Sequence, residues 1–234
     1  MGRALRIIVP NLPFHVLNRG NNRQLVFKDS EDFKYYLGLL IKYKKEFGFK
    51  LYHFILMPNH AHFLLEPTAE GSLPKFMQKI TLAHTRYFNK KYQSIGHVWQ
   101  GRYKSSLIDK EDYFIWCGLY IELNSVRARL AVLPEDWRWS SYNFYAFGKI
   151  DSLTENLIDV DPYYLKLGST SQERQNRYRE VVKEIIKEDS LKRIRKNLDG
   201  GVFGSDDFAK KIKEKFEGAF LGLRGRPRKE EKWT

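Results

Sequence analysis

The spacing of hydrophobic and polar residues predicts alternating strands and helices in the first 124 residues. Residues 14–19 alternate and are rich in β-forming side chains, and the polar turn Gly20-Asn21-Asn22 follows them. After Asp29-Ser30, apolar positions recur at helical spacing as far as Phe47, and Gly48 is typical of a helix C-cap. The pattern therefore predicts a strand and then a helix that ends at Gly48.

Two further β-rich runs are separated by a two-residue turn. Residues 51–57 and 60–65 flank Pro58-Asn59, which predicts an antiparallel hairpin. The elements expected after it are a helix over 73–89, an extended segment over 96–108 and a helix from Asp112 to about Asn124. This order predicts an α+β fold of ferredoxin-like type, with helices on one face of an antiparallel sheet.

The character of the chain changes after residues 137–142. Residues 171–197 are a charged helical stretch, and a short helix is expected over 206–216. With 234 residues and 42% hydrophobic content, the chain can form one substantial core and a small extension. We expect a main domain over 1–148, a helical extension over 149–220 and a basic tail over 221–234 that is disordered on its own.

The charge balance favours a polyanionic partner. Lys and Arg number 41 against 28 Asp and Glu, a formal charge of +13, and nucleic acid is the first candidate for such a surface. A membrane surface ranks lower because the basic residues recur along the whole chain. The single cysteine, Cys117, excludes an internal disulfide framework, and no segment resembles a signal peptide or membrane span. We expect a cytoplasmic, nucleoid-associated protein.

Two histidines on the second hairpin strand are candidate metal ligands. Side chains at i and i+2 of a strand point to the same face, so His60 and His62 can share one ion. Glu66 shares that face but lies roughly 13 Å beyond His62, too far to join them. Two histidines on a half-exposed strand without a metal remain the alternative.

A third ligand has to come from another element, and the helix over 112–124 offers one. Tyr120 and Asn124 lie four residues apart on one face, whereas Glu122 lies on the opposite side of the helix. The alternative for Tyr120 is core packing beside Tyr113 and Trp116. The four isolated histidines are interpreted as structural or exposed: His15, His53, His84 and His97.

Several motifs together resemble the single-tyrosine HUH transposases, also called IS200-like. They are residues 56–65 with His60-Ala61-His62, 120–128 from Tyr120 to Ala128, 15–23, 96–103 and 139–142. Within that family the chain is most similar to the REP-associated tyrosine transposases, from about residue 10 to 145. Two positions depart from the pattern: Asn124 stands where insertion-sequence relatives commonly have Gln, and Ser125 where closer relatives usually have Pro.

The resemblance implies metal-dependent cleavage and strand transfer of single-stranded DNA beside hairpins. Tyr120 would be the nucleophile that forms a 5′-phosphotyrosine, and His60, His62 and Asn124 would hold Mg²⁺ or Mn²⁺. The protein would act as a monomer or a homodimer. Two alternatives remain open: a hairpin-binding protein without catalytic activity, and a metal-dependent nuclease that uses water.

The expected DNA contacts combine a polar turn with basic side chains. The turn at residues 18–23 suits unpaired bases, although Gly20-Asn21-Asn22 also fits turn chemistry alone. The tail at 224–228 resembles an AT-hook, and a solvated tail is the alternative. The candidates are Asn18, Arg19, Asn21, Asn22, Arg23, Arg102, Lys104, Arg127, Arg129, Arg224 and Arg226.

Overall fold

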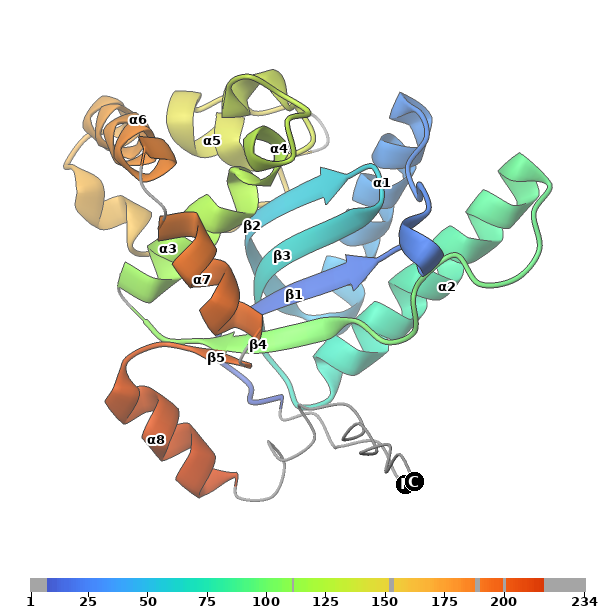
Figure 1. Cartoon of the computed structure of the whole chain (residues 1–234), viewed down its shortest axis with the longest axis horizontal. Helices are drawn as coiled ribbons and strands as arrows, with labels where there is room; N and C mark the ends of the chain where they lie inside the picture. The colour runs from blue at the N-terminus through green and yellow to red at the C-terminus, as the bar shows by residue number, and fades with distance from the viewer. Residues whose placement is uncertain (1–7, 111, 152–153, 188–189, 200, 217–234) are drawn as a thin grey trace, which may run out of the picture.

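The computed structural model describes residues 8–110, 112–151, 154–187, 190–199 and 201–216, which form a five-stranded sheet with helices on both faces (Figure 1). The sheet order is β2-β3-β1-β4-β5. β5 pairs in parallel with β4, and the other neighbouring strands are antiparallel. The strands are β1 (Phe14–Arg19), β2 (Phe49–Met57), β3 (His60–Pro67), β4 (Lys104–Ile108) and β5 (Val202–Phe203).

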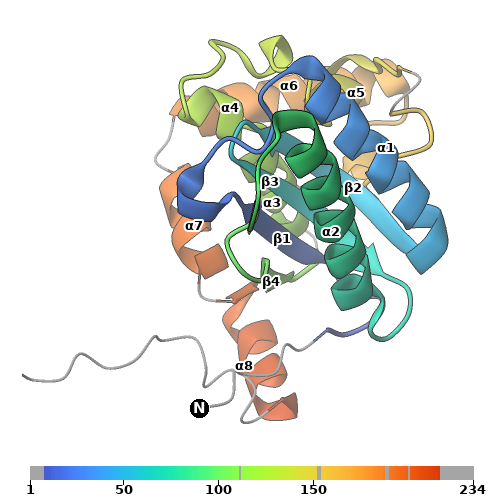
Figure 2. The same ribbon diagram turned by 90° about the vertical axis from the view of Figure 1, so that its right-hand side faces the viewer.

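Helices α1 (Ser30–Phe47) and α2 (Ser72–Tyr92) cover one face of the sheet, as Figure 2 shows from the side. Helices α3 (Asp112–Glu122) and α7 (Ser190–Asp199) cover the other. The remaining elements are η1 (Asn21–Arg23), α4 (Asn124–Arg127), η2 (Pro134–Asp136), α5 (Tyr142–Phe147), η3 (Tyr164–Leu167), α6 (Ser171–Lys187) and α8 (Asp206–Lys215).

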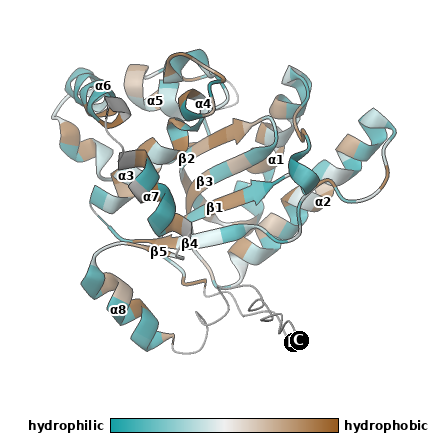
Figure 3. Ribbon diagram, in the orientation of Figure 1, coloured by the Kyte–Doolittle hydropathy of each residue, from teal (hydrophilic) through white to brown (hydrophobic). Residues whose placement is uncertain are grey.

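The predicted α+β fold is confirmed, and the order of β1 to β4 with α1 and α2 is that of a ferredoxin-like unit. The expectation that helices cover one face is incomplete. Ile55 of β2 and Leu64 of β3 are fully buried on the second face, under α3. A sheet that is apolar on both faces needs a layer on each side, and Figure 3 shows hydrophobic residues running along β2 and β3.

Helix α1 begins and ends where the sequence predicts. The Asp29 side chain accepts hydrogen bonds from the backbone amides of Glu31 and Asp32, and the Asp32 side chain completes a capping box. Gly48 has φ 60°, a left-handed conformation that glycine adopts without steric cost. The extended segment expected over 96–108 is shorter, because a strand forms over Lys104–Ile108 and a single bridge joins Trp99 to Gly20.

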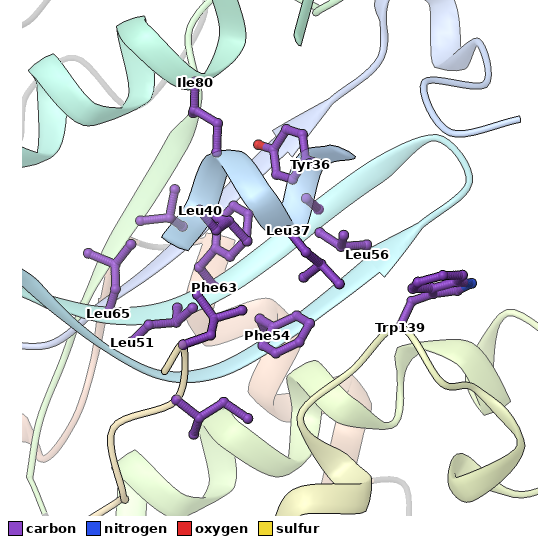
Figure 4. Close-up of a cluster of buried hydrophobic side chains, with 14 of the residues drawn as sticks. Tyr36, Leu37, Leu40, Leu51, Phe54, Leu56, Phe63, Leu65, Ile80 and Trp139 are labelled. Atoms are coloured by element: carbon purple, nitrogen blue, oxygen red, sulfur yellow. The ribbon is translucent and has the colours of Figure 1, made fainter. Parts of the chain in front are cut away.

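The larger core fills the space between the sheet and helices α1 and α2 and extends to α5 and α6. Figure 4 shows Tyr36 and Leu40 from α1 packed against Phe63 and Leu65 from β3. A smaller core lies between the other face and helices α3 and α7, where Cys117 is fully buried. The two cores fix the orientation of β3: Ala61, Phe63 and Leu65 face α1 and α2, so His60 and His62 face α3.

Residues after 148 pack against the same framework. Tyr178 of α6 is fully buried in the larger core, and β5 extends the sheet beside β4. The proposed boundary at residue 148 stays a prediction, and the basic tail lies outside the described residues. Within the ranges that the structure describes, no helix combines the length and apolar character needed to cross a membrane.

Candidate active site

The imidazoles of His60 and His62 are neighbours on the α3 face of β3. Their ring centroids are 5.0 Å apart. In the strand register His60 is opposite Arg19 of β1, and His62 is opposite Leu17. His60 is half-buried and His62 is 3% exposed. The two-residue period of a strand therefore brings both rings to one place, beneath α3.

A third histidine joins this pair from β1. The Nε2 atom of His15 lies 2.7 Å from Nδ1 of His62, and the two rings stack with centroids 5.0 Å apart. The sequence pattern leaves His15 as an isolated histidine, so its place beside His62 was missed. The alternation of β1 puts His15 on one face with Leu17 and Arg19, but the partner strand becomes known only when the sheet order is known.

Asn59 in the hairpin turn contacts the other histidine. Its Oδ1 atom accepts a hydrogen bond from Nδ1 of His60 at 2.5 Å, and its Nδ2 atom donates to the carbonyl of Arg23 at 3.3 Å. With its proton on Nδ1, the His60 ring carries a free lone pair on Nε2. A neutral imidazole with a free lone pair is able to bind a metal ion.

The environment keeps all three imidazoles neutral. Burial lowers the pKa of His15 to about 3. Burial, followed by the positive charges of Arg19, Arg127 and Arg195, lowers the pKa of His60 to about 4. Burial and the neighbouring histidines hold the pKa of His62 well below its ordinary value. At neutral pH these rings are therefore uncharged, and His60 and His62 have positively charged arginines near them.

Tyr120 of α3 faces the histidines. Its ring centroid is 6.1 Å from that of His62 and 5.9 Å from that of His15, and it meets both rings edge to face. The guanidinium of Arg127 lies over the phenol ring, 4.7 Å from its centroid, and Nη2 of Arg127 lies 3.4 Å from the hydroxyl oxygen. The side chain is 4% exposed, so it packs in the smaller core and still has its hydroxyl beside a cation.

Asn124 is engaged by the same arginine. Its Oδ1 atom accepts a hydrogen bond from Nη2 of Arg127 at 2.6 Å, and its Nδ2 atom donates to the carbonyls of Tyr120 and Ile121. The position of Asn124 on the Tyr120 side follows from their spacing, but α3 ends at Glu122 and α4 begins at Asn124. Over the described ranges, no group of three or more His, Cys, Asp or Glu is arranged to hold a metal ion.

The two carboxylates that the sequence excludes as ligands lie elsewhere. Glu122 binds Nδ1 of His53 at 2.8 Å and accepts hydrogen bonds from Tyr178 and Ser141. Glu66 accepts a hydrogen bond from Tyr52 at 3.0 Å. Burial opposes the charged form of His53, but Glu122 and Asp161 outweigh it and raise its pKa to about 9. His53 is thus a buried cation, unlike the three histidines near Tyr120.

Comparison with known proteins identifies the family. The model of a family described as "Transposase IS200 like" matches residues 8–124, half of the chain. The chain belongs to the IS200-like transposase family. The fold of this transposase is similar to that of a REP-associated tyrosine transposase solved with a REP hairpin, at a TM-score of 0.53, 18% identity, and coverage of 64% of this chain and 89% of the other.

A second solved structure, a putative transposase from Deinococcus radiodurans, matches at a TM-score of 0.36 and 19% identity, over 58% of this chain and 98% of the other. That score is too low to bear on the fold. No curated protein matches the chain.

Several of the predicted DNA-contacting residues of this IS200-like transposase lie near the histidine face. Arg19 is opposite His60, and Lys104 is opposite Leu17, the β1 neighbour of His62. The turn η1 lies against the hairpin turn, because Arg23 accepts the Asn59 hydrogen bond, and Asn22 and Arg23 are exposed. The positive charge of Arg195 in α7 contributes to the lowered pKa of His60. Arg195 is an additional basic residue near the site, which the sequence pattern did not single out.

Other predicted contacts lie differently. Asn18 is 1% exposed on the α1 and α2 face, so its position gives no support to a role in DNA binding. Arg102 is exposed before β4, and Arg129 lines a surface hollow beyond α4 with Val126 and Leu130. Arg224 and Arg226 lie outside the described residues.

Proposed function

We propose that this IS200-like transposase cuts and rejoins single-stranded DNA beside hairpins, with Tyr120 as nucleophile and a divalent ion at His60 and His62. The observation that carries the proposal is the contact between the Tyr120 ring and the His62 ring within one chain. Tyrosine and histidines come from different elements, α3 and β3, yet meet at one place. This geometry favours attack in cis and is compatible with action as a monomer.

The donor set fits a divalent ion in part. Nδ1 of each ligand histidine is engaged by a neighbour, which leaves Nε2 of each ring available. Asn124 would supply the third ligand through Oδ1, which now accepts a hydrogen bond from Arg127. An amide oxygen has two lone pairs, so Oδ1 of Asn124 would bind the ion beside its hydrogen bond from Arg127. Two imidazoles and an amide oxygen suit Mn²⁺ or Mg²⁺.

The chain's own residues account for the chemical steps. The hydroxyl oxygen of Tyr120 loses its proton and attacks the phosphorus, the bond from phosphorus to the 3′-oxygen breaks, and the released 3′-oxygen takes up a proton to become a 3′-hydroxyl. Nη2 of Arg127 lies 3.4 Å from the Tyr120 hydroxyl oxygen and stabilises the negative charge on that oxygen when the phenol loses its proton. A divalent ion held by His60 and His62 would polarise the phosphate and neutralise charge that develops on it. A second 3′-hydroxyl reverses the step and joins the strands.

The substrate follows from position and charge. A tyrosine on a helix cannot easily reach a phosphate inside a regular duplex, so we expect a single strand that is bound by basic residues such as Arg19 and Lys104. The REP-associated transposase of similar fold was solved with a REP hairpin. We therefore propose a single strand next to a hairpin, in the nucleoid, as the substrate.

The test is a covalent adduct that survives denaturation. The full chain is incubated with Mn²⁺ and labelled single-stranded hairpin DNA, and adducts are separated on a denaturing gel. We expect the wild type to form an adduct and Tyr120→Phe to form none. Tyr113→Phe changes another tyrosine of α3, one that packs against Phe203, and serves as the matched control; it should keep the adduct.

Other outcomes identify the competing functions. A hairpin-binding protein without catalytic activity binds the DNA equally well in the wild type and in the Tyr120→Phe variant, and cuts nothing. A metal-dependent nuclease that uses water cuts the strand without an adduct and tolerates Tyr120→Phe. Either result rejects the proposed strand transfer.

A further inference from the structure

Each histidine of the candidate metal site has a hydrogen-bonding neighbour on Nδ1. For His60 the neighbour is Asn59 at 2.5 Å, and for His62 it is Nε2 of His15 at 2.7 Å. In metal sites of proteins, the ring nitrogen that does not bind the ion usually donates to such a neighbour, which fixes the tautomer and the ring orientation. The same arrangement is present here on two rings that come from one strand.

We propose that Asn59 and His15 are positioning residues of the metal site, which accept hydrogen bonds from Nδ1 of His60 and His62 and leave both Nε2 atoms free for the ion. The proposal rests on the metal site of the proposed function and deepens it. In this arrangement each residue contacts a ligand histidine: His15 contacts His62, and Asn59 contacts His60. Both act through the tautomer and the orientation of a ligand ring.

The direction of the hydrogen bond from His60 is determined by the contacts of Asn59. Its Nδ2 atom donates to the carbonyl of Arg23, so Oδ1 faces His60 and can only accept. A hydrogen on Nδ1 of His60 is the one arrangement that makes this contact favourable. The hairpin turn that joins β2 to β3 thus sets the tautomer of the first ligand.

The direction of the hydrogen bond in the His15 pair is part of the proposal. Nε2 of His15 and Nδ1 of His62 lie 2.7 Å apart, so one ring donates to the other. Only donation from Nδ1 of His62 to Nε2 of His15 leaves Nε2 of His62 free for the ion, and this is the direction we assign. His15 is 5% exposed and stacked on the ligand ring, so it also restricts the rotation of that ring.

The first test measures the affinity of each variant for Mn²⁺. Binding is monitored by the loss of the free Mn²⁺ signal in electron paramagnetic resonance. His15→Leu and Asn59→Ala each remove an acceptor and should weaken binding about 10- to 100-fold. His15→Gln and Asn59→Asp keep an acceptor oxygen and should restore most of the affinity. His84→Gln replaces a buried histidine on the opposite face, where its ring packs against Tyr36 and Trp99, and should leave the affinity unchanged.

The results separate this inference from the proposed function. If the wild type forms the Tyr120 adduct while His15→Leu and Asn59→Ala bind Mn²⁺ as tightly as the wild type, the positioning roles are wrong and the function stands. If the wild type forms no adduct but binds Mn²⁺ in a manner that depends on both acceptors, the function is wrong and the inference stands. A wild type that binds no Mn²⁺ overturns the inference.

A second measurement needs no substitution and so does not depend on whether a variant folds. Nitrogen-15 chemical shifts of the imidazoles in the metal-free wild type report which ring nitrogen carries the proton. We expect the proton of His60 and of His62 on Nδ1 and a bare Nε2 on both rings. A proton on Nε2 of either ring overturns the role of its neighbour, Asn59 or His15.

Discussion

Histidines on the two sides of helix α3 have different charge states. On one side Tyr120 meets His62 and His15, which burial keeps neutral. On the other side, two residues along, Glu122 meets His53, which two carboxylates keep charged. A helix turns by roughly 200° in two residues, so one short segment faces both environments.

The difference lies in the partners that each histidine receives, since burial alone opposes the charge in every case. His60 and His62 have arginines near them, and these positive charges add to burial in keeping both imidazoles uncharged. His53 has Glu122 and Asp161, which links β2 and α3 to the segment after α5. We interpret the side of α3 that carries Tyr120 as the chemical side. We call the contacts of His53 with Glu122 and Asp161 the anchor, because they hold α3 in place.

The largest expected effect is on the anchor. His53→Gln leaves Glu122 and Asp161 buried without a cation, and breaking a buried ion pair in this way costs about 3–5 kcal/mol of the free energy of unfolding. Urea denaturation followed by circular dichroism measures the loss. We expect the adduct yield to fall with it at temperatures where the anchor melts.

The matched control for that experiment is His62→Gln on the other side of α3. No charge loses its partner there, because His62 is neutral, so we expect a cost of about 1 kcal/mol, typical of single substitutions. Equal losses in the two variants would show that the contrast between the two sides is wrong.

The next effect is the pH dependence that His53 gives the protein. Its pKa is about 9 in the folded chain and 6.5 for the free side chain, so the folded state holds a proton that the unfolded state has lost between these values. The stabilisation is complete below pH 6.5 and is lost as the pH rises through 9. Denaturant titrations should show a fall of about 1.4 kcal/mol per pH unit in this window. His53→Gln should flatten the slope, and His62→Gln should keep it.

Sequence reasoning reached the parts of the molecule that depend on local periodicity. The hairpin at Pro58-Asn59, the common face of His60 and His62, and the opposite directions of Tyr120 and Glu122 all follow from the period of a strand or helix. These elements are confirmed because each relation spans only a few residues.

The remaining features depend on pairs that are distant in the sequence. His15 meets His62 across 47 residues, and His53 meets Asp161 across 108. The first contact requires β1 to lie beside β3, and the second requires the segment after α5 to fold back on β2. Neither pairing leaves a periodic signal, so both histidines looked isolated, and the helix layer of α7 on the second face was missed for the same reason.

A smaller effect tests how tightly the anchor is packed. A Cβ at Gly118 of α3 would lie 2.6 Å from Nε2 of His53. Gly118→Ala therefore overpacks this contact, which lowers the free energy of unfolding by about 1–3 kcal/mol. Better helix propensity returns about 1 kcal/mol, and the net loss should be about 1 kcal/mol. In α1, Gly38 has open space around its Cβ position, so Gly38→Ala should stabilise. A gain in both variants would contradict close packing of α3 on His53.

The smallest effect belongs to the chemical side, at Arg195 of α7. This exposed side chain lowers the pKa of His60 and has no place in the anchor. If it contacts a phosphate, Arg195→Ala weakens binding of single-stranded DNA to a similar extent for all sequences, and the slope of log affinity against log salt falls by about 0.7. Lys79→Ala removes an exposed charge from α2 on the opposite face and should leave that slope unchanged. Fluorescence anisotropy at several salt concentrations measures both slopes. Equal slopes for the two variants would show that the DNA does not contact α7. The basic residues left to bind DNA near Tyr120 would then be Arg19, Lys104 and Arg127.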